Sequence, residues 1–212
     1  MLEWGVIQAG GKSARMGRDK AWLEIGKKTL IEHGLSALRP VAERLAIVIS
    51  EGTPAPERYA ALAATWQADL LVDRHGFLGP LGGIQTALAM LREASARDQA
   101  AAILACDLPF LPTALLAHLA EIHRTGDFAL TLPEDAQGRP QPLAAIYSLR
   151  CLPAVEQLLA DRRLRVDGLY PLVRTRRVRY DEYRTLFASD EDAQRSLTNL
   201  NTRDDVARIA PR

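Results

Sequence analysis

One stretch near the amino terminus, residues 4–20, restricts most strongly how this chain can fold. Its sequence is WGVIQAGGKSARMGRDK, an apolar run that stops at Gly10-Gly11 and continues with four basic residues, Lys12, Arg15, Arg18 and Lys20. Glycine has no Cβ, so backbone N–H groups there can turn inward and bind phosphate. The stretch therefore predicts a buried strand followed by a loop that binds an anion.

Two common phosphate-binding patterns do not fit this loop. A Walker A motif needs a glycine five residues before Gly11, and Val6 stands there instead. A Rossmann fingerprint needs its second glycine where Lys12 stands. A plain glycine turn with a solvated basic loop is the remaining alternative, although four neighbouring cations would repel one another without an anion to gather them.

The composition limits the class of protein. The 212 residues are 48% apolar and suffice for one α/β domain with a large core, while a net charge of +1 argues against a general nucleic-acid or membrane-surface binder. Cys106 and Cys151 form no CxxC pattern and are expected to be reduced, buried thiols. The chain starts MLEWG, without the pattern of a signal peptide or a membrane span, so a cytoplasmic protein without membrane or nucleic-acid partners is expected.

Strands and helices are expected to alternate over the first 130 residues. This pattern predicts an α/β fold, a Rossmann-like three-layer sandwich with a mostly parallel sheet and helices on both faces. We expect one domain over 1–212, in which 1–110 bind mainly nucleotide and 111–212 mainly an acceptor. Beyond the first strand, strands are expected at 21–25, 45–49, 70–72, 101–105, 128–132, 142–147 and 178–180. Helices are expected at 30–38, 57–66, 79–94, 113–123, 152–159 and 166–173, with a last one after Thr202.

Several polar residues follow directly on expected strands. Gly10-Gly11, Asp73 and Asp107 each stand where a strand ends, so they should meet at the carboxyl edge of a parallel sheet, where ligands gather. Mg²⁺ takes carboxylate and phosphate oxygens and uses only one or two protein carboxylates, which makes Asp107 the first candidate for a metal ligand. Asp73 is expected to bind the nucleotide ribose or assist the metal. A turn-forming aspartate before a proline, and a cap or partner of Arg74, are the respective alternatives.

Three further groups have both a structural and a functional interpretation. Gly79-Pro80-Leu81-Gly82-Gly83 is either a plain turn into a helix or a place where a base or ribose approaches the backbone. Asn199 and Asn201 alternate, so they are either a polar loop or two amides that contact a second substrate. Seven arginines form either a solvated face or a docking surface for an anionic substrate or partner: Arg162, Arg163, Arg165, Arg174, Arg176, Arg177 and Arg179. The histidines follow no catalytic spacing; His33, His118 and His123 are expected to be structural, and His75 could line the cleft.

The motifs together resemble those of the molybdenum cofactor guanylyltransferase family, within the nucleotidyltransferase superfamily. The run AGGKSARMG at residues 9–17, followed by Asp19-Lys20, resembles the signature loop of the superfamily. Four later segments resemble this family in the same order along the chain: 79–83 (GPLGG), 105–110 (ACDLPF), 142–147 (PLAAIY) and 199–202 (NLNT). The likeness therefore spans nearly the whole chain.

The resemblance implies transfer of GMP from GTP to molybdenum-molybdopterin, giving the guanine dinucleotide cofactor and pyrophosphate, with Mg²⁺ as cofactor. Molybdoenzymes or their chaperones are further candidate partners. The expected catalytic residues are Arg15, Lys20 and Asp107, with Asp107 holding the metal. The expected nucleotide contacts are Gln8, Ala9, Gly10, Gly11, Lys20, Asp73, Gly79 and Asp107, and the expected acceptor contacts are Asn199 and Asn201.

Two positions depart from the family pattern. Gln8 stands where relatives usually carry an apolar residue, and Ser50 where some carry an asparagine that contacts the nucleotide. Both bear on recognition of base and ribose. Transfer of another nucleotide, for example cytidylyl transfer to the same cofactor or transfer to a sugar phosphate, therefore stays open, as does a non-catalytic nucleotide-binding protein.

Overall fold

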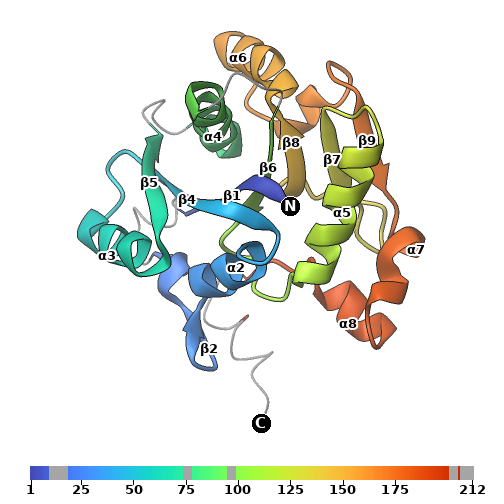
Figure 1. Ribbon diagram of the computed structural model, residues 1–212, viewed down its shortest axis with the longest axis horizontal. Helices are drawn as coiled ribbons and strands as arrows, with labels where there is room; N and C mark the ends of the chain where they lie inside the picture. Colours follow the sequence, from blue (N-terminus) through green and yellow to red (C-terminus); the bar gives the residue numbers. More distant parts are fainter. Residues whose placement is uncertain (10–18, 74–77, 95–98, 201–204, 206–212) are drawn as a thin grey trace.

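The computed structural model describes residues 1–9, 19–73, 78–94, 99–200 and 205, and its centre is a seven-stranded sheet (Figure 1). The strand order is β5-β4-β1-β6-β8-β7-β9, and β8 alone runs antiparallel to its neighbours within this part of the chain. The strands are β1 (Leu2–Gln8), β4 (Ala42–Ser50), β5 (Ala68–Asp73), β6 (Ala100–Ala105), β7 (Leu130–Pro133), β8 (Ala144–Ser148) and β9 (Thr175–Val178). The expected mostly parallel α/β sheet is confirmed.

Helices cover both faces of this sheet (Figure 1). Helices α2, α3 and α5 pack on one face and α4 and α6 on the other. The longer helices are α2 (Leu30–Leu38), α3 (Pro56–Trp66), α4 (Pro80–Ala94), α5 (Thr113–Thr125) and α6 (Leu152–Ala160). The shorter helical segments are η1 (Lys20–Trp22), η2 (Leu149–Cys151), η3 (Val166–Leu169), α7 (Tyr180–Tyr183), η4 (Arg184–Leu186) and α8 (Asp190–Arg195).

The central strands are apolar on both sides because each face of the sheet has its own core. Val6 packs with the α4 and α6 side, and its neighbour Ile7 packs with the α2 and α5 side. Both side chains are fully buried. This double burial explains why the parallel strands appear in the sequence as continuous apolar runs rather than as an alternation of apolar and polar residues.

The register of the parallel strands brings their carboxyl ends to one edge. Gln8 stands opposite Val48 of β4 and Ala105 of β6, and Ser50 stands opposite Asp73 of β5. The ladder continues past the strands, because the Ala9 N–H donates to the Val48 carbonyl at 2.8 Å. The predicted meeting of the strand ends is confirmed for the described residues; Gly10 and Gly11 lie outside them.

The expected strand at 21–25 is only partly correct. Residues Lys20–Trp22 form the 3-10 turn η1, and Glu24–Ile25 forms a short hairpin, β2, with β3 (Lys28–Thr29). The alternating residues Ala21, Leu23 and Ile25 imitate a strand, but the Asp19 side chain accepts a hydrogen bond from the Ala21 N–H and caps a helical turn instead.

Two expectations in the carboxyl-terminal third are corrected. The helix predicted over 166–173 stops at Leu169, because Gly168 and Pro171 both disfavour a continued helix. The edge strand predicted at 178–180 lies at Thr175–Val178, although it is indeed at the edge of the sheet. Helix α7 begins at Tyr180, where the Glu182 carboxylate accepts the Arg179 N–H at 2.7 Å and caps it.

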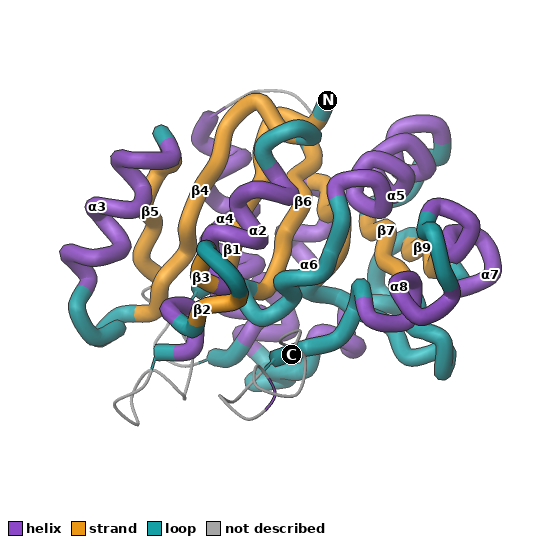
Figure 2. The backbone as a smooth tube through the Cα atoms, turned by 90° about the horizontal axis from the view of Figure 1, so that it is seen from below, coloured by secondary structure: helices purple, strands orange, loops and turns teal. Residues whose placement is uncertain are grey.

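Helices α7 and α8 lie at the end of the molecule opposite α3, beyond β7 and β9 (Figure 2). His33, His118 and His123 lie in α2 and α5, as expected, while His75 and the helix expected after Thr202 fall outside the residues the structure places. Cys106 and Cys151 are both buried thiols outside any disulfide in the described part of the chain, as expected. Within the described ranges, no helix has the length and apolar character needed to cross a membrane.

Candidate functional site

The turn after β6 and the first residue of η1 meet in an ion pair. Lys20 Nζ lies 2.5 Å from Asp107 Oδ2, although the two residues are 87 positions apart in sequence. Asp107 lies in the turn that follows β6, and its side chain is 11% exposed, whereas that of Lys20 is 25% exposed. Two residues that belong to separate motifs are therefore in contact at the carboxyl edge of the sheet.

The second oxygen of the Asp107 carboxylate, Oδ1, is buried and has no hydrogen-bond partner among the described residues. A buried acceptor without a partner is rare and needs an explanation. A cation beside Oδ1 would satisfy it without breaking the bond from Lys20 to Oδ2. The described residues contain no cluster of three His, Cys, Asp or Glu side chains that could hold a metal.

Asp19 and Tyr59 hold the turn that carries Lys20. Asp19 Oδ1 accepts the Ala21 N–H at 3.1 Å, and Asp19 Oδ2 accepts the hydroxyl of Tyr59 from α3. Tyr59 is fully buried, and this burial together with the Asp19 hydrogen bond raises the pKa of its hydroxyl far above the ordinary value. The hydroxyl therefore stays a donor at every physiological pH and fixes the turn that carries Lys20.

A tilted contact between two aromatic rings supports the same turn. The ring centroids of Trp22 and Tyr59 lie 4.9 Å apart, and the Arg58 guanidinium lies 4.1 Å from the Trp22 ring centroid. Sequence reasoning did not identify Tyr59 as a site residue. A weak signal was available, since an aspartate directly before a short turn is a typical N-cap, but its partner on a distant helix could not be read from the sequence.

The glycines of the GPLGG segment, at the start of α4, each have a structural reason. Gly79 has a φ of +68° and open space around it, so it is a glycine for conformational reasons. A Cβ on Gly82 would lie 2.6 Å from Asp73 Oδ2, and a Cβ on Gly83 would lie 2.7 Å from Gln8 Cδ. The paired glycines therefore let two side chains from the ends of β5 and β1 approach the first turn of the helix.

We expect Gly82→Ala to weaken nucleotide binding by displacing the Asp73 carboxylate, which is 4% exposed and has little room to move. KM for the nucleotide should rise by about tenfold, and the free energy of unfolding should fall by ~1–3 kcal/mol through overpacking. Steady-state kinetics and urea denaturation measure the two effects.

A double-mutant cycle with Asp73→Ala is the control for this prediction. Gly82→Ala should change KM by less than about twofold when Asp73 is already alanine, because the clash is then gone. Additive effects of the two substitutions on KM would show that Gly82 acts by another route.

Gln8 presents a second unsatisfied polar group at the same edge. Its side-chain Nε2 is buried and has no acceptor among the residues the structure describes, while its backbone carbonyl accepts the Cys106 N–H at 3.1 Å. The side-chain amide of Gln8 thus lies beside Gly83. The backbone of Gln8 is held by a hydrogen bond, whereas its Nε2 has no acceptor among the described residues. Cys106 itself is inert, because burial and the neighbouring Asp107 charge raise the pKa of its thiol to about 12.

The expected acceptor residue Asn199 is exposed and lines a cavity of 700 Å³ together with residues of the β7–β8 connection and α8. The segment is tied to the site, since the Leu200 N–H donates to the Asp107 carbonyl at 2.9 Å. Of the other expected site residues, Ala9 is buried at the end of β1. Outside the described residues lie Gly10, Gly11, Arg15 and Asn201.

Most of the arginine-rich segment is neutralised by acids. Five of its seven arginines form ion pairs: Arg165–Asp167, Arg174–Asp127, Arg176–Glu182, Arg177–Glu134 and Arg179–Asp181. These pairs are mostly exposed and each contributes little to stability. For these five side chains the structure favours an ion-paired surface over a row of free charges, whereas Arg162 and Arg163 form no ion pair within the described residues.

Comparison with known proteins points in the same direction as this geometry. Residues 5–177 match the family model described as "MobA-like NTP transferase domain". A protein of Carboxydothermus hydrogenoformans named "probable molybdenum cofactor guanylyltransferase" is 35% identical over 206 residues, which cover 96% of this chain and 93% of that protein.

Solved structures show the same fold. A crystal structure of molybdopterin-guanine dinucleotide biosynthesis protein A from Archaeoglobus fulgidus has a TM-score of 0.74 and 22% identity, covering 97% of this chain and 95% of that one. The 2-C-methyl-D-erythritol 4-phosphate cytidylyltransferase of Thermus thermophilus has a TM-score of 0.58 and 16% identity, covering 97% and 96%. Because proteins named for different nucleotides share the architecture, the fold alone does not select the base.

Proposed function

Because the chain belongs to the family of MobA-like NTP transferases, we propose that it transfers GMP from GTP to molybdenum-molybdopterin, releasing pyrophosphate. The observation that carries this proposal is the Lys20–Asp107 pair at the carboxyl edge of the sheet. It places one cation and one carboxylate with an unsatisfied oxygen where a parallel sheet binds its ligand. The names of the relatives support guanine as the base and the molybdenum cofactor as the acceptor.

Nucleotidyl transfer requires that negative charge on the phosphates be offset and that the reacting groups be aligned, rather than a strong base. A terminal phosphate oxygen of the acceptor is already anionic, so the barrier comes from repulsion between two phosphates and from poor alignment. In the proposed mechanism, Lys20 offsets the charge that develops on the leaving pyrophosphate. Tyr59 and Asp19 hold the turn of Lys20 in place, and Arg15 and the glycines Gly10 and Gly11 are proposed to bind the phosphates.

Asp107 is proposed to hold Mg²⁺, which fits the unpartnered Oδ1 atom and the preference of this ion for carboxylate and phosphate oxygens. When bound, the ion would supply positive charge to the phosphates and orient them. Ala9, Gly79 and Asp73 are proposed to contact the nucleotide, with Asp73 and Gln8 against the first turn of α4.

The acceptor is proposed to lie toward the second half of the chain. Asn199 and Asn201 would contact it, since their segment is hydrogen-bonded to Asp107 through Leu200. In this arrangement residues 1–110 contribute mainly to the nucleotide site and 111–212 mainly to the acceptor site. We place the enzyme in the cytoplasm, with molybdoenzymes or their chaperones as further candidate partners.

A thermal-shift screen of GTP, CTP, ATP and UTP, each with and without Mg²⁺, tests the proposal first. A ligand at 100 times its Kd stabilises the folded state by about 2.7 kcal/mol, which gives a clear rise in Tm. A rise confined to GTP, followed by pyrophosphate release with molybdenum-molybdopterin under anaerobic conditions, supports guanylyl transfer. A rise with CTP alone would move the enzyme to cytidylyl transfer, and GTP binding without pyrophosphate release would indicate a binding protein.

Gln8→Leu is expected to raise stability and reduce base selectivity at the same time. The substitution removes a buried donor without a partner, so the free energy of unfolding should rise by ~1 kcal/mol. If the amide contacts the base, the preference for GTP over the other nucleotides should fall by about tenfold in Kd ratios.

Gln99→Leu is the matched control for Gln8→Leu. Gln99 also carries a buried side-chain atom without a partner, Oε1, but it stands just before β6, at the amino edge of the sheet. This variant should gain similar stability and keep the nucleotide preference of the parent. An unchanged preference in Gln8→Leu as well would remove Gln8 from base recognition.

A further inference from the structure

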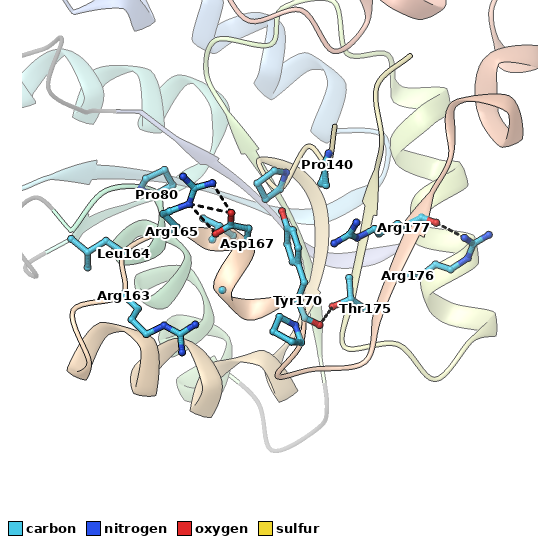
Figure 3. Close-up of a pocket in the computed structure, with 14 residues that line it drawn as sticks. Pro80, Pro140, Arg163, Leu164, Arg165, Asp167, Tyr170, Thr175, Arg176 and Arg177 are labelled. Carbon is cyan, nitrogen blue, oxygen red and sulfur yellow. Dashed lines mark hydrogen bonds and ion pairs between the residues drawn. The ribbon is translucent and has the colours of Figure 1, made fainter. Parts of the chain in front are cut away.

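A second cavity opens beside the candidate site, on the face of the sheet that carries α4 and α6 (Figure 3). Its volume is 1280 Å³, which is sufficient for a multi-ring ligand. Three elements form its walls: the first residue of α4 (Pro80), the β7–β8 connection (Pro140 and Pro142) and the stretch from the end of α6 to the start of β9 (163–177). Pro80 and Pro142 belong to the GPLGG and PLAAIY motifs, but the other lining residues lie outside the motifs, and none of the lining residues is a proposed nucleotide contact.

Four arginines and one aromatic ring, that of Tyr170, line this cavity. The Arg177 guanidinium lies 5.1 Å from the ring centroid of Tyr170, and Figure 3 shows Arg165 on the side of Pro80 and Arg163 below. Arg176 contributes to the lining, but its guanidinium pairs with Glu182 away from the cavity. Four arginines and the acid Asp167 line the cavity, and three of these arginines pair with acids, which leaves the positive charge of Arg163 without a counter-charge among the described residues.

Arg163 is the least neutralised of these cations. It is exposed, its guanidinium lies against the backbone of Gly168, and it forms no ion pair within the described part of the chain. Arg165 and Arg177 pair with Asp167 at 2.6 Å and Glu134 at 3.6 Å. A guanidinium that no carboxylate occupies can bind an anionic ligand with all of its donors.

The walls are held by hydrogen bonds that leave the guanidinium groups of the arginines unused. The Arg163 N–H donates to the Leu158 carbonyl at 2.8 Å, which ends α6 in a Schellman turn with Arg162 at φ +55°. The Thr175 hydroxyl donates at 3.2 Å to the Tyr170 carbonyl, and the Tyr147 hydroxyl donates at 2.8 Å to the Pro142 carbonyl. The cavity is therefore formed before any ligand arrives.

The cavity adjoins the candidate nucleotide site at two points. Pro80 begins the same turn of α4 that carries Gly82 and Gly83. Pro142 precedes Leu143, whose carbonyl accepts the Ala105 N–H at 2.9 Å, two residues before Asp107. A ligand in the cavity can thus extend toward Asp107 along the carboxyl edge, as a second substrate of group transfer must do.

We propose that this cavity binds the body of the acceptor, a flat fused-ring heterocycle with an anionic group, through Tyr170 and the guanidinium of Arg163. The inference rests on the proposed function and adds to it the place of the acceptor ring system. A flat ring suits the face of Tyr170, and an anionic group suits the arginines. An acidic segment of a partner protein is the competing occupant, and it is less favoured because the positive lining is concave and faces the nucleotide site.

Arg163→Gln tests the proposal, with Arg162→Gln as the matched control. The neighbouring Arg162 is equally exposed but does not line the cavity. The probe is metal-free molybdopterin, whose pterin fluorescence is titrated anaerobically against each full-length variant. We expect Kd for the probe to rise by about tenfold in Arg163→Gln and to change by less than about twofold in Arg162→Gln. Arg163→Lys should recover only part of the affinity, since lysine lacks the planar fork.

A parallel thermal shift with GTP separates the two claims. The GTP shift should be the same in all variants, because Arg163 lies outside the proposed nucleotide contacts. Equal Kd values for Arg163→Gln and Arg162→Gln would overturn the acceptor assignment while GTP transfer by the parent protein remains intact. Conversely, a parent protein that binds the pterin through Arg163 but transfers no nucleotide would retain the cavity and overturn the proposed function.

Discussion

Asp107→Ala is expected to lower kcat/KM for nucleotidyl transfer by about 10³-fold or more, with the fold intact, because the variant loses both the proposed metal ligand and the partner of Lys20. The backbone carbonyl of residue 107, which accepts the Leu200 N–H, is unaffected by the substitution. Lys20 is 25% exposed and can be solvated when its partner is removed. The free energy of unfolding should therefore fall by only ~1–2 kcal/mol. Pyrophosphate release and urea denaturation measure the two quantities.

The control for Asp107→Ala is Asp69→Ala, which removes a carboxylate from an exposed pair with Arg44 at 3.1 Å. Activity should stay within about twofold, since a surface pair contributes at most ~1 kcal/mol and this pair lies near the amino ends of β4 and β5, away from the carboxyl edge. Titration with Mg²⁺ adds a second readout. Asp107→Ala should lose the Mg²⁺-dependent part of the GTP thermal shift, and a folded, fully active Asp107→Ala enzyme would remove Asp107 from the mechanism.

Lys20→Ala is expected to cost ~2–4 kcal/mol of transition-state stabilisation, or roughly 30- to 1000-fold in kcat/KM, the size observed when one electrostatic donor is lost. The effect should appear mainly in kcat, because the charge that Lys20 meets grows as pyrophosphate leaves. The loss of Lys20 also leaves Asp107 Oδ2 without its ion-pair partner, so the nucleotide-free protein should be less stable by ~1–3 kcal/mol.

Lys28→Ala is the matched control for Lys20→Ala. Lys28 lies close in sequence, is exposed, and donates to Ser36 Oγ at 2.8 Å. This variant should keep both its activity and its stability. A decrease of less than tenfold in kcat/KM for Lys20→Ala would argue against a role in the transition state. In the Lys20→Ala/Asp107→Ala double variant the losses should be far from additive, because the two side chains are in direct contact.

Local pattern and strand alternation determined much of this protein. The apolar runs at β1, β4 and β6 were predictable because these central strands are buried on both faces, and Asp107 follows the run of β6. The shorter run of the edge strand β5, in which Val72 is exposed, ends at Asp73. Parallel strands must present their carboxyl ends at one edge, so the meeting of these residues followed from the order of elements alone. Family motifs then narrowed the chemistry to nucleotidyl transfer.

Short-range signals were misleading where distant partners decide the local conformation. Residues 20–22 became a turn because Asp19 caps it and Tyr59 of α3 holds Asp19. The alternation of Ala21, Leu23 and Ile25 in the sequence does not indicate that contact. Likewise, the sequence 166–173 has helical spacing, but η3 ends at Leu169 before Pro171 and the chain turns there to form a cavity wall.

The sequence by itself determined the α/β class, the sheet edge where ligands gather, and the identity of Lys20, Asp73 and Asp107 as candidates, because burial periodicity and strand polarity are local properties. Only the tertiary structure decided which groups are in contact: the pairing of Lys20 with Asp107, the approach of Asp73 to Gly82, and the acids that pair with five of the seven arginines of the arginine-rich segment. Such contacts join residues up to 87 positions apart, and their distances depend on how helices pack against the sheet. That packing is a property of the whole core and is not encoded in any single stretch of the chain.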